Sequence, residues 1–220
     1  AHEQYFGLER LYDLCAKIAP RLHAMRVGRV IARPFAGEIG AFERTGNRKD
    51  YAMTPPQPVL SNWLQDAGHP VIGIGKISDI FSGQGLDHSL TGSDMVLMQH
   101  LKDQFAQAAD GSFVFANFVE FDSLYGHRRD VAGYARALEW FDRALASLLA
   151  AMKPDDLLIL TADHGNDPTW PGTDHTRERV PVLCAGMGPK PLGLLGFEDV
   201  AATVATYLNV TPKGQGKSFL

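Results

Sequence analysis

Short, almost wholly apolar runs alternate with amphipathic helical segments over most of this chain, and this alternation limits the folds open to it. Apolar runs at residues 70–74, 112–119 and 156–161 each follow a segment whose apolar residues recur at helical spacing. Strands that are apolar along their whole length are buried on both faces, which is typical of parallel sheets covered by helices. The sequence therefore predicts an α/β/α sandwich with a mostly parallel sheet.

The expected elements are helices over 7–26, 58–67, 93–109, 131–152 and 197–208, and strands over 27–35, 70–74, 112–119, 156–161 and 180–185. Pro20 predicts a kink or break in the first helix, because proline has no amide proton to donate inside a helix. Residues 36–56 are rich in glycine and charge and end near Pro55-Pro56, which predicts a loop and a domain boundary.

Composition and charge narrow the possible functions. The chain has 220 residues, 45% of them apolar, and its 21 basic and 25 acidic side chains give a net charge of −4. This balance excludes wholesale disorder and gives no support for binding to nucleic acid or to an anionic membrane. No apolar run approaches the roughly 18 residues that span a membrane, and the two cysteines, Cys15 and Cys184, resemble neither a disulfide framework nor a thiolate metal site. We expect a cytoplasmic protein.

Side chains that bind metals follow two of the expected strands. The candidate ligands are Asp122, His127, Asp163, His164 and His175. The first two follow the strand at 112–119 and the other three follow 156–161, so we expect them to converge at the carboxyl edge of the sheet. Mixed carboxylate and imidazole ligands suit Mn²⁺, Zn²⁺ or Fe²⁺. Five ligands are too many for one four-coordinate ion and suit two ions, the arrangement that clamps both oxygens in phosphoryl transfer.

Three of the candidate ligands also have an ordinary structural interpretation. Asp163 suits a helix cap, His164 a turn, and Asp122 a solvated loop. For any one of these residues alone, that interpretation is favoured over metal binding. The whole set, placed at the ends of two buried strands, favours a metal site.

Cationic side chains suited to a phosphate stand at Arg33, Arg44, Arg48 and Lys76. Lys76 directly follows an apolar, glycine-containing strand, which favours a ligand-binding role. A solvated loop accounts for Arg44 and Arg48 almost as well. Beside His175, the side chains of Asp174 and Arg177 are candidates for orienting its ring.

Several strings of this sequence resemble the phosphopentomutase family, which belongs to the alkaline-phosphatase superfamily. They are residues 163–178 (DHGNDPTWPGTDHTRE), 121–130, 28–35 (GRVIARPF), 44–51 (RTGNRKDY), 75–81 (GKISDIF) and the closing 216–220 (GKSFL). The short string ADHG is shared with cofactor-independent phosphoglycerate mutases and many phosphatases. The longer string around it is far more specific.

This resemblance implies interconversion of ribose or deoxyribose 1-phosphate and 5-phosphate with two Mn²⁺ ions. It implies that Asp122, His127 and His175 hold one ion, that Asp163 and His164 contribute to the other, and that Arg33, Arg44, Arg48 and Lys76 hold the phosphate that does not react. The implied fold is the alkaline-phosphatase-like sandwich with part of a small α+β cap that excludes water. Residues 1–52 would be the C-terminal part of the cap, and residues 53–220 the C-terminal part of the metal-binding core.

Members of this family are substantially longer on the N-terminal side, and the resemblance offers no threonine of this chain as the phosphoryl-accepting nucleophile. We therefore expect the chain to be the C-terminal portion of such an enzyme and to lack turnover by itself. Two alternatives stay open. One is another phosphomutase or phosphatase of the superfamily, such as a cofactor-independent phosphoglycerate mutase or a sulfatase-like hydrolase. The other is a non-catalytic module that binds metal or sugar phosphate.

Overall fold

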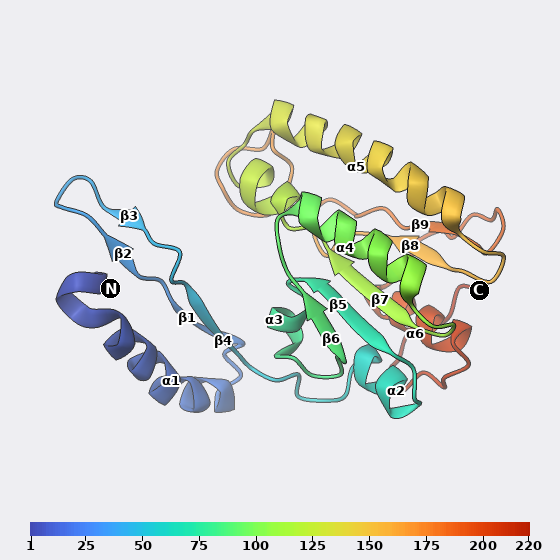
Figure 1. Ribbon diagram of the computed structural model, residues 1–220, viewed down its shortest axis with the longest axis horizontal. Helices are drawn as coiled ribbons and strands as arrows, with labels where there is room; N and C mark the ends of the chain where they lie inside the picture. Colours follow the sequence, from blue (N-terminus) through green and yellow to red (C-terminus); the bar gives the residue numbers. More distant parts are fainter. The chain divides into compact units, whose positions relative to one another are not determined.

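The computed structural model describes residues 1–220, which divide into two compact units (Figure 1). Unit 1 comprises residues 1–59 and 78–84, and unit 2 comprises residues 60–77 and 85–220. Unit 1 thus extends past the predicted division after residue 52 and takes in a short later segment. The assignment of the two parts of the chain to a cap and a core stays a prediction.

Unit 1 is built on a long helix packed against a β-ribbon. A π-helical turn, η1 (Glu3–Gly7), leads into α1 (Leu8–Ala24), which faces β1 (Arg29–Ala32). The side chains buried between them are Leu11, Cys15, Ala19, Val30 and Ala32. The helix continues past Pro20, so the predicted break is absent. Ala19 and Leu22 pack into this cluster on either side of the proline, and that packing holds the helix across the missing hydrogen bond.

Residues 36–56, predicted as a loop, contribute instead to the β-ribbon. Its strands are β1, β2 (Phe35–Ala36), β3 (Glu43–Arg44) and β4 (Lys49–Ala52), with β1 paired to β4 and β2 to β3, both antiparallel. Gly37 begins the turn with a φ of 104°, and a Cβ there would lie 2.4 Å from the Ala41 carbonyl oxygen. The strands are so short and so polar that no alternating pattern marks them in the sequence.

Unit 2 contains a three-stranded parallel sheet of order β6-β5-β7. The central strand β5 (Val71–Gly75) is buried throughout and pairs with β6 (His88–Leu90) and β7 (Phe113–Asn117). Strand β6 was not predicted, because its three residues are partly polar and lie exposed or half-buried at the edge of the sheet. The short helix α3 (Ile77–Phe81), also unpredicted, lies between β5 and β6 in the chain.

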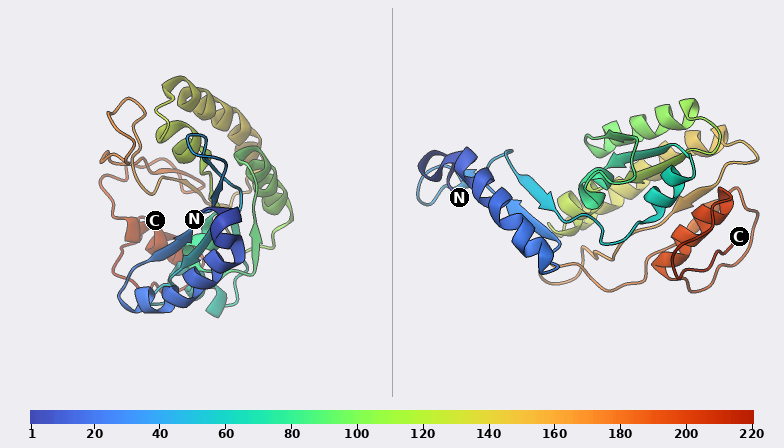
Figure 2. Two further views of the ribbon diagram at one scale, coloured as in Figure 1. Left: turned by 90° about the vertical axis from the view of Figure 1, so that its left-hand side faces the viewer. Right: turned by 90° about the horizontal axis from the view of Figure 1, so that it is seen from below.

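Helices cover both faces of this sheet. The helices of unit 2 are α2 (Leu60–Asp66), α4 (Asp94–Gln107), α5 (Val131–Ala151) and α6 (Phe197–Tyr207). Val71 packs with Leu64 of α2 and Val204 of α6, whereas Ile72 packs with Leu97 of α4. Because neighbouring residues of a strand point to opposite faces, the two clusters lie on opposite faces of the sheet. The predicted α/β/α sandwich is confirmed (Figure 2, right).

The predicted strands at 156–161 and 180–185 form an antiparallel pair separate from the parallel sheet. They are β8 (Leu158–Leu160) and β9 (Leu183–Ala185). A parallel return would need a crossover, usually a helix, and the chain between residues 161 and 182 forms none. This long loop instead carries candidate metal ligands.

No helix in the structure combines the length and apolar character needed to cross a membrane.

Candidate metal centre

The chain turns sharply after β7, and this turn carries two of the predicted ligands. Asp122 lies within the π-helical turn η2 (Phe121–Gly126), and His127 directly follows it. The His127 amide donates to the Asp122 carbonyl oxygen at 2.9 Å, which closes one wide turn between the two residues. Their side chains therefore lie on the same side, with His127 Nε2 3.4 Å from Asp122 Oδ2.

A buried carboxylate on α4 fixes the start of this turn. The two oxygens of Asp94 accept from the backbone amides of Val119 and Glu120, both at 3.1 Å, and Glu120 Oε1 accepts from the Asp94 amide at 3.2 Å. Burial, together with the Glu120 carboxylate, raises the pKa of Asp94 to about 6, although the two amide hydrogen bonds oppose the shift. These reciprocal bonds tie the first turn of α4 to the segment that delivers Asp122.

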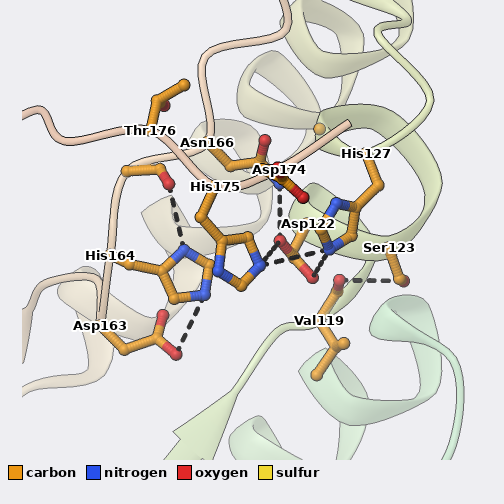
Figure 3. Close-up of polar contacts among 12 residues, drawn as sticks. Val119, Asp122, Ser123, His127, Asp163, His164, Asn166, Asp174, His175 and Thr176 are labelled. Carbon is orange, nitrogen blue, oxygen red and sulfur yellow. Dashed lines mark hydrogen bonds and ion pairs between the residues drawn. The ribbon is translucent and has the colours of Figure 1, made fainter. Parts of the chain in front are cut away.

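The third ligand comes from the loop between β8 and β9. His175 Nε2 lies 3.2 Å from Asp122 Oδ1 and 3.2 Å from His127 Nε2 (Figure 3). An ion bound at about 2.1 Å by two imidazoles holds their nitrogens roughly 3 Å apart, so this spacing suits a shared divalent ion. Asp122, His127 and His175 thus form a compact group whose ligand atoms all lie within 4.8 Å of one another.

Hydrogen bonds to backbone carbonyls determine which ring nitrogens are free to bind metal. His127 Nδ1 lies 2.6 Å from the Thr173 carbonyl oxygen, and His164 Nδ1 lies 3.1 Å from that of Gly165. A carbonyl oxygen can only accept, so each Nδ1 carries a proton, and in the neutral tautomer this leaves the Nε2 lone pair for a metal. The rings are therefore oriented as metal-binding histidines usually are.

Asp163 and His164 flank the compact group. His164 Nε2 lies 3.5 Å from Asp163 Oδ2, and the His164 ring stacks on that of His175 with 3.7 Å between centroids. The His175 ring stacks in turn on that of His127 at 4.8 Å. All five predicted ligands therefore lie in one region of unit 2, three in the compact group and two beside it (Figure 3).

Sequence reasoning missed two residues that support the group. Asn166 is 9% exposed, and its Nδ2 donates to Asp122 Oδ1 at 2.6 Å. The Arg129 guanidinium donates to Asn166 Oδ1 at 2.7 Å. The one feature of the sequence that could have indicated a supporting role for them is that each lies two residues from a predicted ligand, His127 or His164. The side chains of Asp174 and Arg177, which were predicted to orient His175, form no hydrogen bond with it. The backbone carbonyl oxygen of Asp174 instead accepts a hydrogen bond from Arg129 at 2.6 Å.

Residues 18–212 match the Metalloenzyme superfamily. The chain belongs to this superfamily. Among its curated relatives, the phosphopentomutase of Chromohalobacter salexigens is 52% identical over 230 residues and that of Sinorhizobium medicae 51% identical over 225. Both matches cover 100% of this chain and 55% of the relative, so the chain spans about half the length of the curated relatives it matches. The resemblance seen in the sequence is confirmed.

A solved structure shares the fold. The PH0037 protein from Pyrococcus horikoshii superposes with a TM-score of 0.53 and 15% sequence identity, over 94% of this chain and 66% of that protein. At this identity the similarity concerns the fold alone. It agrees with the mixed α/β metalloenzyme architecture described above.

The four predicted phosphate-binding cations of this metalloenzyme fall in different units. Arg33, Arg44 and Arg48 belong to unit 1, and Lys76, which is exposed after β5, belongs to unit 2. Arg33 is exposed between β1 and β2, and Arg44 is exposed in β3 opposite Phe35. Arg48 is engaged by Asp50 through hydrogen bonds of 2.7 and 2.8 Å, which raise the pKa of its guanidinium. Phosphate binding by these four residues stays a prediction.

Proposed function

We propose that the protein acts as a phosphopentomutase that interconverts ribose or deoxyribose 1-phosphate and 5-phosphate at a site with two Mn²⁺ ions. The observation that carries the proposal is the convergence of Asp122, His127 and His175 in a chain about half identical, over its whole length, to phosphopentomutases. The ligand group supports metal-dependent phosphoryl transfer in general. The similarity over the whole chain narrows the substrate to a pentose phosphate.

We assign Asp122, His127 and His175 to one ion, and Asp163 and His164 to a second. Bound divalent ions would neutralise phosphate charge and hold the attacking and leaving oxygens in line. The protein's part is to present ligands already in place. Asp122 divides its two oxygens between the histidines, with Oδ1 toward His175 and Oδ2 toward His127. Stacking of the three imidazoles keeps their spacing.

We further propose that Arg33, Arg44, Arg48 and Lys76 bind the phosphate that does not react. Arg33, Arg44 and Lys76 are exposed and form no side-chain ion pair. Arg48 would exchange the Asp50 carboxylate for the phosphate, because both present two oxygens to the same guanidinium fork. A sugar phosphate is therefore the expected small-molecule partner.

We place the protein in the cytoplasm and propose no nucleic-acid partner. Cys15 and Cys184 are free thiols, as is usual in a reducing compartment. The net charge of −4 disfavours binding to a phosphate backbone.

The test is to assay the full protein with Mn²⁺ on ribose 1-phosphate, deoxyribose 1-phosphate and 3-phosphoglycerate. We expect the full-length protein to isomerise the pentose phosphates without release of free phosphate and to lose that activity in Asp122→Asn, whereas the 220-residue chain alone should show no turnover. The matched control is Asp155→Asn, because Asp155 is exposed and lies before β8 rather than after it. Conversion of phosphoglycerate alone would favour the phosphoglycerate mutase alternative. Metal binding without any turnover would favour a non-catalytic module.

A further inference from the structure

We propose that Arg129 is a positioning residue that assembles the metal centre, by tying the turn after β7 to the loop between residues 165 and 175. The proposal rests on the proposed function in one respect, namely that a divalent ion binds at Asp122, His127 and His175. It goes beyond that function because Arg129 is not itself a candidate ligand. It acts through the backbone and side chains that hold the ligands.

The Arg129 guanidinium uses all three of its nitrogens. Nε donates to the Gly172 carbonyl oxygen at 2.5 Å, and Nη2 donates to the Asp174 carbonyl oxygen at 2.6 Å. Nη1 donates to the Gly126 carbonyl oxygen at 2.9 Å, to Asn166 Oδ1 at 2.7 Å and to the Asp167 carbonyl oxygen at 3.1 Å. The Gly126 carbonyl belongs to the turn that carries Asp122. The other four acceptors belong to the loop that carries His175. One side chain therefore bridges the two segments that deliver the compact group.

The loop has no regular secondary structure of its own to hold it in place. Its ends meet at an isolated bridge between Gly165 and Thr176, and the Thr176 hydroxyl accepts from the Asp167 amide at 2.7 Å. The carbonyls of Gly172 and Asp174 accept their side-chain hydrogen bonds from outside the loop. Arg129 donates both of these bonds, and the carbonyl between the two residues, that of Thr173, orients His127.

Arg129 also sets the orientation of the Asn166 amide. Because Asn166 Oδ1 accepts from Arg129 Nη1, its Nδ2 must face Asp122 Oδ1, to which it donates at 2.6 Å. Without the guanidinium, the amide could rotate by half a turn and place its own oxygen against the Asp122 carboxylate, which is repulsive. The path from Arg129 through Asn166 thus holds one oxygen of a metal ligand.

Arg129 has an unusual backbone conformation, and its neighbour Arg128 provides a matched control. Arg129 has a φ of 56°, a left-handed conformation that costs a non-glycine residue about 1 kcal/mol and persists only where the surroundings impose it. Its neighbour Arg128 is exposed, and its side chain forms no hydrogen bond or ion pair. Substitutions at Arg128 therefore remove the same charge from the same stretch of chain without touching the network.

The experiment compares Arg129→Lys and Arg129→Met with Arg128→Lys and Arg128→Met in the full protein. Mn²⁺ affinity is measured by electron paramagnetic resonance titration, and the visible absorption of bound Co²⁺ reports the geometry of the ligands. We expect Mn²⁺ binding to weaken by about 10- to 100-fold in Arg129→Met, the range found when partners of metal ligands are removed. Arg129→Lys should recover part of the loss, since one ammonium can reach only some of the acceptors. Both Arg128 variants should match the wild type.

A double-mutant cycle tests the path through Asn166. If Arg129 acts on Asp122 through that amide, Arg129→Lys combined with Asn166→Ala should lose less Mn²⁺ affinity than the sum of the two single losses. Additive losses would overturn the path. Unchanged Mn²⁺ affinity and Co²⁺ absorption in a folded Arg129 variant would overturn the positioning role itself.

The possible failures are distinguishable from one another. A wild-type protein that binds neither Mn²⁺ nor Co²⁺ would overturn the proposed metal function, whatever the variants do. Circular dichroism and urea unfolding show whether each variant folds. If Arg129→Met does not fold, Arg129→Lys and Asn166→Ala carry the same comparison with the Arg128 variants.

Discussion

The Asp122 carboxylate contacts two histidines that belong to different parts of the chain. Its Oδ2 faces His127, five residues later in the same turn, and its Oδ1 faces His175 from the loop after β8. Asn166 adds a hydrogen bond to Oδ1, so neither oxygen is free to rotate away. At the scale of single residues, the candidate centre depends on this one side chain more directly than on its exposed neighbour Asp163.

Replacing Asp122 by asparagine should therefore weaken Mn²⁺ binding by more than about 100-fold, which exceeds the usual effect of removing a partner of a ligand. The amide removes the negative charge and places an N–H beside one of the histidine nitrogens. Isothermal titration calorimetry measures the affinity, with Asp155→Asn as the control. Equal affinities in the two variants would contradict the assignment of Asp122 as a ligand.

At the scale of elements, the reciprocal hydrogen bonds between Asp94 and Glu120 join α4 to the segment that follows β7.

Most helices and buried strands of unit 2 could be predicted from hydrophobic periodicity, because that pattern is a local property of the chain. The ribbon strands, α3 and β6 could not be predicted in this way, since they are short and partly polar. Pairing with neighbouring strands, rather than local sequence, makes β2, β3 and β6 extended.

The raised pKa of Asp94 gives a pH dependence with a definite sign. Its pKa is about 6 in the folded protein against an ordinary 3.8, so between these values the folded state binds more protons than the unfolded state. The free energy of unfolding should therefore fall as pH rises through this window, by at most about 3 kcal/mol from this group. Urea unfolding at pH 4 to 7 measures it. The free energy of unfolding of the wild type minus that of Asp94→Asn should fall over that range, because asparagine does not titrate, and a constant difference would contradict the prediction.

Gly75 closes the central strand at the point where it pairs with Asn117. Its φ is 81°, and a Cβ would lie 2.3 Å from the Asn117 carbonyl oxygen. Gly75→Ala should therefore lower the free energy of unfolding by well over about 1 kcal/mol, through strain and a clash together. Gly68→Ala is the control, because Gly68 has a φ of 87° with no atom within 4 Å of the added Cβ. Equal losses in urea unfolding would show that the clash contributes nothing.

At the scale of the whole molecule, the two compact units divide the predicted functional residues between them. All five candidate metal ligands lie in unit 2, whereas three of the four candidate phosphate-binding cations lie in unit 1. Each unit has its own buried cluster, around Leu11 in unit 1 and around Leu64 and Leu97 in unit 2. The stability of unit 1 and metal binding in unit 2 should therefore be separable.

Leu11→Ala should lower the stability of unit 1 by about 2–5 kcal/mol and leave Mn²⁺ affinity unchanged below the unfolding temperature. The expected loss comes from the cavity left in the cluster around α1. Leu97→Ala is the matched variant in unit 2, because Leu97 is buried in the cluster that it forms with Ile72 and Ile74 of β5. Thermal unfolding and Mn²⁺ titration on both variants check the prediction. Weaker Mn²⁺ binding in folded Leu11→Ala would contradict it.

The fold class of this protein, its family and the residue types of its candidate metal centre all follow from the amino-acid sequence. Periodic burial and the string at residues 163–178 are local features that any reader of the chain can recover. Only the tertiary structure decided that Asp122, His127 and His175 face one point while Asp163 and His164 flank it. It alone revealed Arg129 and Asn166. The acceptors of Arg129 in the loop and the Asp122 carboxylate that accepts from Asn166 lie some 40 residues away in the chain, and no periodic pattern marks such contacts.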